Sequence, residues 1–170
     1  MEQIRTNKVF GWARLKYWIP AVVVAALISA FSTHYFTAEE TGKVIVPILR
    51  WFLPHASSTL IRHLHFGIRK LAHVMEFGVF SITVFRAFRG PRAGWRLDWA
   101  LLTFLVTFSY AVLDEFHQTY VPRRHFSLKD MAIDGFGAVL AQLVVWWYAK
   151  GKWRFARIRK EPKLAKGQDR

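Results

Sequence analysis

Four long runs of apolar residues stand out along the chain, separated by short polar segments. They cover residues 17–37, 68–88, 97–118 and 130–149. About 20 mainly apolar residues are needed to cross the hydrocarbon core of a bilayer as an α-helix. Because backbone groups in lipid must hydrogen-bond to one another, each run is expected to be helical. The pattern therefore predicts an all-α integral membrane protein with four transmembrane helices in a bundle.

A shorter apolar stretch, at residues 44–53, lies between the first two predicted spans. It contains Pro47 and is followed directly by Pro54. Apolar stretches of this length are too short to cross a bilayer and are typical of interfacial or re-entrant segments. We therefore expect an interfacial or re-entrant segment between the first and second helices.

Composition supports a membrane protein and argues against a nucleic-acid-binding protein. The chain is 53% hydrophobic although its formal net charge is +14. Soluble nucleic-acid-binding proteins can be as basic, but they are rarely so apolar. The charges are also segregated, since no Lys, Arg, Asp or Glu occurs at 17–38 or 99–113. The chain has no Cys, which excludes disulfides and thiolate chemistry. We expect membrane lipids as partners, and no nucleic acid.

Basic residues are concentrated on one side of the predicted spans. Most of the 25 Lys and Arg residues precede residue 17, follow residue 149 or lie between the second and third spans. Cytoplasmic segments of membrane proteins carry an excess of Lys and Arg. The distribution predicts a membrane domain at 17–149, with basic cytoplasmic segments at 1–16 and 150–170, so that both termini lie inside.

Polar and ionisable residues recur near the outer ends of three predicted spans. These residues are Lys70, His73 and Glu76 on the second span, Asp114, Glu115, His117 and Gln118 on the third, and Asp130 and Asp134 on the fourth. Ionisable side chains in membrane spans usually face a cavity or one another and mark functional sites. The three clusters therefore predict one shared site at the outer surface. Gly137 continues the face of Asp130 and Asp134, which predicts close approach of another helix there.

Each of these residues also has a structural interpretation. Lys70 could extend its amine to the outer interface along an apolar surface. Asp114 and Glu115 could pair with nearby Lys and Arg side chains and hold helices together. Asp130 could stabilise the positive N-terminal end of the last span.

A divalent metal is a further alternative. His73, Glu76, Asp114 and His117 are residue types that bind metals, and a site needs three or four of them in suitable geometry. Their spacing is not diagnostic of such a site. We therefore expect no cofactor and keep these four residues as an alternative ligand set.

The polar clusters resemble the motifs of the VanZ family of bacterial membrane proteins. The resemblance rests on KLAHVMEFGVF (70–80) and LDEFHQTYVPRRHFSLKDMAIDGFG (113–137). The family pattern has Lys and His on one span, Asp-Glu-x-x-Gln on the next, then Arg, Ser-x-x-Asp and Gly leading into the last span. The matching residues here are Lys70, His73, Asp114, Glu115, Gln118, Arg124, Ser127, Asp130 and Gly137. Asp134 stands where the family commonly has Asn.

The resemblance is strongest over residues 65–145. It implies a small multi-pass protein of the bacterial cytoplasmic (inner) membrane that acts at the cell envelope. The family is named for a protein that raises resistance to teicoplanin, so the resemblance also implies a link to antibiotic resistance.

Three functions remain open. The first is an envelope protein that acts on or binds a lipid-linked or cell-wall component, such as a glycopeptide or a cell-wall precursor, at the outer face. As an enzyme it would be a hydrolase or transferase on a head group. Its candidate catalytic residues are Lys70, His73, Asp114, Glu115, Gln118 and Asp130, and its candidate ligand-binding residues are Arg124, Ser127, Asp134 and Glu76. The second is a non-enzymatic binding or scaffold protein. The third is a proton-coupled carrier, against which the confinement of the clusters to one end of the spans argues.

Overall fold

The computed structural model describes residues 2–122 and 126–165, with side chains described at 14–33, 35–122 and 126–151. Within these ranges every regular element is helical. The elements are α1 (Glu2–Phe31), the 3-10 turn η1 (His34–Phe36), α2 (Ala38–Phe52), α3 (Ser58–Arg89), α4 (Leu97–Gln118) and α5 (Leu128–Ala165).

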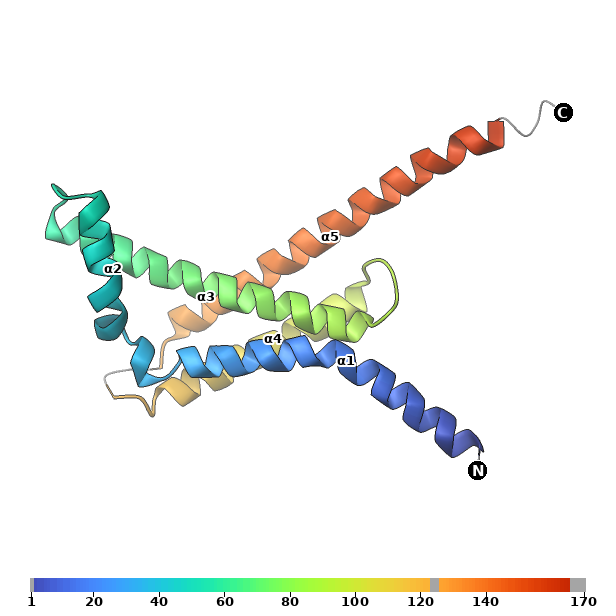
Figure 1. Ribbon diagram of the computed structural model, residues 1–170, viewed down its shortest axis with the longest axis horizontal. Helices are drawn as coiled ribbons and strands as arrows, with labels where there is room; N and C mark the ends of the chain where they lie inside the picture. Colours follow the sequence, from blue (N-terminus) through green and yellow to red (C-terminus); the bar gives the residue numbers. More distant parts are fainter. Residues whose placement is uncertain (1, 123–125, 166–170) are drawn as a thin grey trace.

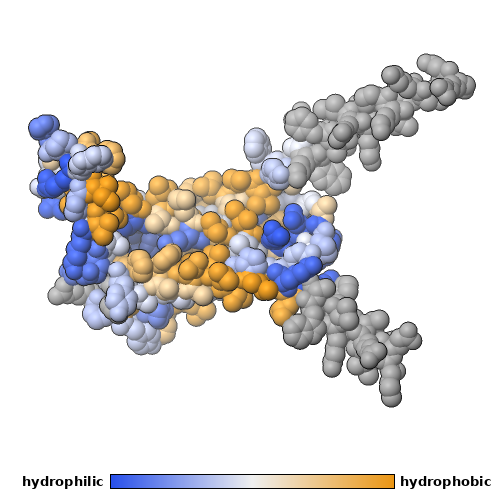
Figure 2. All heavy atoms as spheres, in the orientation of Figure 1, coloured by the Kyte–Doolittle hydropathy of each residue, from blue (hydrophilic) through white to orange (hydrophobic). Residues whose placement is uncertain are grey.

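Four of these helices are long and apolar enough to cross a bilayer. The spanning parts are Arg14–Phe31 of α1, Ser58–Arg89 of α3, Leu97–Gln118 of α4 and Leu128–Gly151 of α5. Figure 2 shows mainly hydrophobic residues across the middle of the face in view, with hydrophilic residues gathered toward both ends. The prediction of an all-α membrane bundle with four spans is therefore confirmed.

The long helix α3 is the centre of the bundle. It contacts α1, α4, α5 and α2, and its contact with α5 is the most extensive. Figure 1 shows that the start of α1, the end of α5 and the α3–α4 connection lie at one end, whereas α2, the end of α4 and the start of α5 lie at the other. We call these the terminal end and the α2 end.

A close crossing at Gly137 joins α3 and α5. A Cβ atom added at Gly137 would lie 2.4 Å from the carbonyl oxygen of Val74, closer than real Cβ contacts allow. The expected close approach at Gly137 is therefore present. Further along the same two helices, Ser81 donates a hydrogen bond to the carbonyl oxygen of Ala138 (3.1 Å), and the Gln142 amide donates to the Ser81 hydroxyl (2.8 Å). These buried bonds satisfy polar groups that lipid cannot.

The face of α1 that packs on the bundle combines the small residues Ala21 and Ala25 with the larger Ile28. Ala21 and Ile28 are buried in a cluster with Phe77, Phe80, Val84 and Ala111. Between them, the Tyr110 hydroxyl donates a hydrogen bond to the carbonyl oxygen of Ala25 (2.6 Å). Small side chains allow close packing of transmembrane helices, which explains why α1 fits against α3 and α4.

The segment expected to be interfacial or re-entrant is part of α2. Figure 1 shows α2 lying across the end of the bundle, transverse to α1 and α3. None of its residues is buried, and Val44, Ile48 and Trp51 are among its exposed apolar residues. This is the geometry of an interfacial helix rather than of a re-entrant loop. The helix also continues through Pro47, although proline lacks the N–H for a helical hydrogen bond.

The bounds of two other spans differ from the prediction. The first span ends at Phe31 rather than at residue 37, because the chain turns into η1 after α1. The last helix does not end at residue 149 but continues to Ala165.

The helix α3 begins at Ser58 rather than at residue 68. The Ser57 hydroxyl caps it by accepting a hydrogen bond from the backbone N–H of Leu60 (3.2 Å), as Ser does at helix N-termini. The first turns of α3 contain Arg62, His63 and His65 among apolar residues. Because of these polar residues, the unbroken apolar run begins about ten residues after the start of the helix.

Candidate functional site

A cavity of about 260 Å³ opens at the α2 end of the bundle. We call it the α2-end cavity. Residues of α1, η1, α2, α3 and α4 surround it: Phe31, Ser32, Phe36, Thr41, Ile45, Ile68, Arg69, Ala72, His73, Glu76 and Gln118. Aromatic and aliphatic side chains thus share the wall with cationic, anionic and amide groups.

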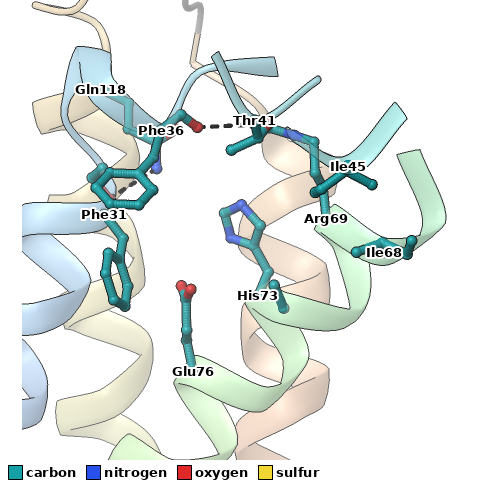
Figure 3. Close-up of a pocket in the computed structure, with 11 residues that line it drawn as sticks. Phe31, Phe36, Thr41, Ile45, Ile68, Arg69, His73, Glu76 and Gln118 are labelled. Atoms are coloured by element: carbon teal, nitrogen blue, oxygen red, sulfur yellow. Dashed lines mark hydrogen bonds between the residues drawn. The ribbon is translucent and has the colours of Figure 1, made fainter. Parts of the chain in front are cut away.

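Side chains from successive turns of α3 form one wall of the cavity. In Figure 3, His73 and Glu76 point into the cavity, and Arg69 extends toward Thr41 of α2. Arg69 donates hydrogen bonds to the carbonyl oxygen of Phe36 (3.1 Å) and to the Thr41 hydroxyl (2.9 Å). Arg69 therefore ties α3 to η1 and α2, and holds α2 in place beside the cavity.

Two polar pairs connect α3 to the first turns of α5. Lys70 forms an ion pair with Asp130, and His73 Nδ1 lies 3.2 Å from Asp134 Oδ1. Asp134 is fully buried, and its Oδ2 has no hydrogen-bond partner among the described residues. Lys70 and His73 follow the same flank of α3, while Asp130 and Asp134 are one turn apart on α5. Lys70 therefore pairs with a carboxylate instead of extending alone to the interface.

A second set of hydrogen bonds joins α4 to α1. Asp114 Oδ1 accepts a hydrogen bond from the Ser32 hydroxyl (2.6 Å), and Asp114 Oδ2 accepts one from the Gln118 amide (2.7 Å). Asp114 and Gln118 share a face of α4 because they are four residues apart. The buried carboxyl of Asp114 thus has a partner on each oxygen, as buried polar groups require.

Glu115 connects α4 to the start of α5. It is fully buried, and its Oε2 accepts a hydrogen bond from the backbone N–H of Ser127 (2.8 Å). The Ser127 hydroxyl in turn accepts a hydrogen bond from the N–H of Asp130 (3.2 Å) and caps α5. The capping side chain is therefore Ser127, and Asp130 lies in the first helical turn beside it.

These contacts show where the residues predicted from the sequence lie. Lys70 and His73 meet Asp130 and Asp134, Glu115 meets Ser127, and Glu76 and Gln118 reach the cavity. The expected structural pairing of Asp114 and Glu115 with Lys or Arg is not found among the described residues, where Ser32, Gln118 and Ser127 are their hydrogen-bond partners. Arg124 lies outside the described residues.

No metal cluster is formed by the described residues. In that part of the chain, no three His, Asp or Glu side chains are grouped so that they could hold an ion. Of the alternative ligand set, His73 is paired with Asp134, Asp114 has both oxygens hydrogen-bonded, and His117 is exposed. The four residues therefore do not form one coordination sphere.

Two side chains at this end fall outside the sequence-based site. Ser32 holds Asp114, and Thr41 accepts a hydrogen bond from Arg69. A signal for Ser32 was present, because it continues the spacing of Ala21, Ala25 and Ile28 along the packing face of α1. No comparable signal marked Thr41, since its position depends on how α2 folds back onto α3.

The fold and the polar site define a small multi-pass helical membrane protein with a cavity at one end of its bundle. A family model, VanZ/LLP1, matches residues 17–149. The chain therefore belongs to the VanZ/LLP1 family, and the family resemblance seen in its motifs is confirmed. Comparisons with curated proteins and with solved structures gave no match.

Proposed function

We propose that the chain binds a lipid-linked or cell-wall component at the outer face of the bacterial cytoplasmic membrane and thereby contributes to teicoplanin resistance. The observation that carries this proposal is the mixed lining of the α2-end cavity. Phe31, Phe36 and Ile68 line it together with His73 and Glu76. Binding sites for small molecules typically combine apolar walls with a few polar groups that orient the ligand.

The position of the cavity suits an amphiphilic ligand. It lies beside α2, whose apolar side chains are exposed at the end of the hydrophobic band. A ligand with a lipid tail could keep the tail in the bilayer while its head group enters the cavity. Arg69 and His73 offer hydrogen-bond donors to a phosphate or carboxylate, and charge-assisted bonds of this kind are strong.

The positive-inside rule supports the proposed outward orientation of the α2 end. Arg86, Arg89, Arg92 and Arg96 lie in or beside the α3–α4 connection, at the same end as the basic termini. Because the chain contains no Cys, single cysteines can be introduced and labelled in intact cells. We expect a membrane-impermeant thiol reagent to label Trp51→Cys and not Arg92→Cys. The reverse pattern would place the cavity inside.

The polar residues divide into ligand contacts and positioning residues. We assign His73, Glu76 and Gln118 to ligand contact because they line the cavity. We assign Asp114 and Asp130 to positioning because they hold neighbouring helices through hydrogen bonds and an ion pair. We also assign a positioning role to four residues at the junction of α3, α4 and α5: Lys70, Glu115, Ser127 and Asp134. Arg124 is proposed as a further ligand contact from the family pattern alone.

A hydrolase or transferase is the second candidate, favoured by the pair of His73 and Asp134. A carboxylate on one ring nitrogen fixes the orientation and the tautomer of an imidazole, which is how general bases are commonly held. His73 Nδ1 faces Asp134, while the ring points into the cavity. Formation of a product from a bound lipid-linked precursor would support catalysis, and saturable binding without product would support the binding protein.

A proton-coupled carrier has less support. Residues 77–85, 99–113 and 135–149 contain no Lys, Arg, Asp, Glu or His, and α1 contains none from residue 17 to Phe31. A proton path across a membrane normally uses a chain of titratable side chains. The ionisable groups here are confined to the ends of the spans.

The proposal is tested by filling the cavity without removing a polar group. Ala72 lines the cavity, whereas the adjacent Leu71 is exposed and does not. We expect Ala72→Phe to abolish protection against teicoplanin in a susceptible bacterial host, at equal membrane levels of protein, and Leu71→Phe to retain it. Retained protection in both variants would contradict a role for the cavity. Absence of protection by the wild type would end the link to resistance.

A further inference from the structure

A second cavity, of about 360 Å³, lies at the terminal end of the bundle, remote from the site described above. We call it the terminal-end cleft. Its lining comes from three helices and the turn after α3. Arg14 and Trp18 belong to α1, Phe88 belongs to the last turn of α3 and Arg92 follows it, and Trp99 and Leu102 belong to α4. Two guanidinium groups from distant parts of the sequence therefore line one hollow together with aromatic rings.

The position of Arg92 is defined by the turn after α3. Gly90 ends the helix with a positive φ of 59°, a conformation that glycine adopts without strain. Arg92 then donates hydrogen bonds from Nε to the carbonyl oxygen of Arg89 (3.1 Å) and from Nη2 to that of Phe88 (3.1 Å). Its guanidinium lies 4.8 Å from the centre of the Trp99 ring. These contacts hold a cation against the aromatic wall of the cleft.

Among the described residues that line the cleft, the acidic one is Asp98, and it is already paired with a base. Arg96 donates two hydrogen bonds to the Asp98 carboxylate, at 2.9 and 3.1 Å. The Asp98 hydrogen bond and charge raise the pKa of Arg96 above its usual value, so this pair stays ionised. Arg14 and Arg92 add two further positive charges to the lining of the cleft.

The apolar side of the cleft leads to the lipid-facing surface. Trp18 and Phe88 meet edge to face, with their ring centres 5.2 Å apart. Leu102, further along α4, is exposed on the outside of the bundle. Tryptophan at the ends of membrane spans usually lies at the level of the lipid head groups. The cleft therefore combines a cationic part at the depth of phosphates with an apolar part at the depth of acyl chains.

We propose that the terminal-end cleft binds an anionic glycerophospholipid, with its phosphate at Arg14 and Arg92 and its acyl chains along Leu102. The proposal does not depend on the function of the α2-end cavity. It explains why Arg92 is held by backbone carbonyl oxygens beside an aromatic ring, which a general attraction to anionic membranes does not require. With the termini inside, the lipid belongs to the cytoplasmic leaflet.

The test is lipid retention by the full-length protein in native mass spectrometry. Purified protein is mixed with dioleoylphosphatidylglycerol or with dioleoylphosphatidylcholine, and the fraction of each that stays bound is measured. We expect phosphatidylglycerol to be retained over phosphatidylcholine. Arg92→Gln and Arg14→Gln should each weaken retention about fivefold, the typical contribution of one basic residue at an anionic membrane surface. Arg92→Lys should restore part of the loss.

Arg86→Gln is the matched control, because Arg86 is exposed in the last turn of α3 and does not line the cleft. Arg14→Gln leaves the turn after α3 intact, which separates loss of lipid from loss of that turn. Equal losses in Arg86→Gln and Arg92→Gln would show general surface attraction and overturn the proposal. Equal retention of both lipids would also overturn it, as would displacement of the lipid by millimolar inorganic phosphate, which would identify a soluble anion as the ligand.

Discussion

A methyl group added at Gly137 has no room between α5 and α3. Its Cβ would lie 2.4 Å from the carbonyl oxygen of Val74 and 3.0 Å from the Val74 Cα atom. Both are backbone atoms, so no side-chain rotation relieves the clash, and the helices must separate by about 1 Å to restore ordinary contact. Overpacking of this kind costs about 1–3 kcal/mol. We therefore expect Gly137→Ala to lower the free energy of unfolding by that amount.

Two other glycines of the same bundle provide controls for this variant. A Cβ at Gly78 would meet the carbonyl oxygen of Gly137 at 3.5 Å, an ordinary contact, and a Cβ at Gly67 would meet nothing within 4 Å. Alanine has a helix propensity up to about 1 kcal/mol better than glycine, so Gly67→Ala and Gly78→Ala should be as stable as the wild type or more stable. The measurement is reversible unfolding of the purified protein in mixed detergent micelles.

Gly137→Ala also tests how packing between α3 and α5 supports the polar site. His73 Nδ1 and Asp134 Oδ1 lie 3.2 Å apart, close to the point where α3 and α5 cross at Val74 and Gly137. A separation of about 1 Å puts the two atoms beyond hydrogen-bonding distance. We expect Gly137→Ala to lose teicoplanin protection as well as stability. If it unfolds at the same denaturant concentration as Gly78→Ala, the helices do not cross as closely as described and the reasoning fails.

Three further predictions concern single polar contacts. Ser32→Ala removes a donor from the buried carboxyl of Asp114 and should cost about 1–3 kcal/mol in the same unfolding assay, whereas an unchanged midpoint would deny the contact. Lys70→Ala and Glu115→Gln should each reduce teicoplanin protection, with the double variant no worse than either; additive losses would indicate separate sites. Asp134→Asn keeps an acceptor for the imidazole N–H and removes a carboxylate whose Oδ2 has no hydrogen-bond partner among the described residues, so it should unfold within about 1 kcal/mol of the wild type. A larger loss would show that the charge itself is needed.

The spans and the end of the bundle that carries the polar residues were predictable from the sequence. Apolar runs long enough to cross a bilayer leave few alternatives to helices, because lipid offers the backbone no other partners. The close approach at Gly137 was also predictable, since it lies on the face of Asp130 and Asp134. These features depend on length, composition and helical spacing, which are local properties of the chain.

The partner of each polar residue was not predictable in the same way. Asp114 lies beside Ser32 of α1, and Glu115 beside the backbone of Ser127, whereas the sequence offered a Lys or Arg as one alternative partner for both. Partner choice depends on how each helix is rotated about its axis, and packing between helices sets that rotation. The transverse direction of α2 was not predictable for a similar reason, because the contact of Arg69 with Thr41 forms only after the chain has folded back.

Packing and polar chemistry therefore depend on each other at the α2 end. A buried carboxyl without a partner costs several kcal/mol, so the full burial of Glu115 and Asp134 is tolerable only where a donor is held within reach. The donors come from neighbouring segments, His73 of α3 for Asp134 and the backbone of Ser127 before α5 for Glu115, and the close crossing at Gly137 brings α3 and α5 near. Substitutions at such packing positions should then resemble substitutions of the polar residues in their effect on function. If an alanine scan finds loss of teicoplanin protection only at charged positions and not at packing positions, packing and polar chemistry are not coupled in this way.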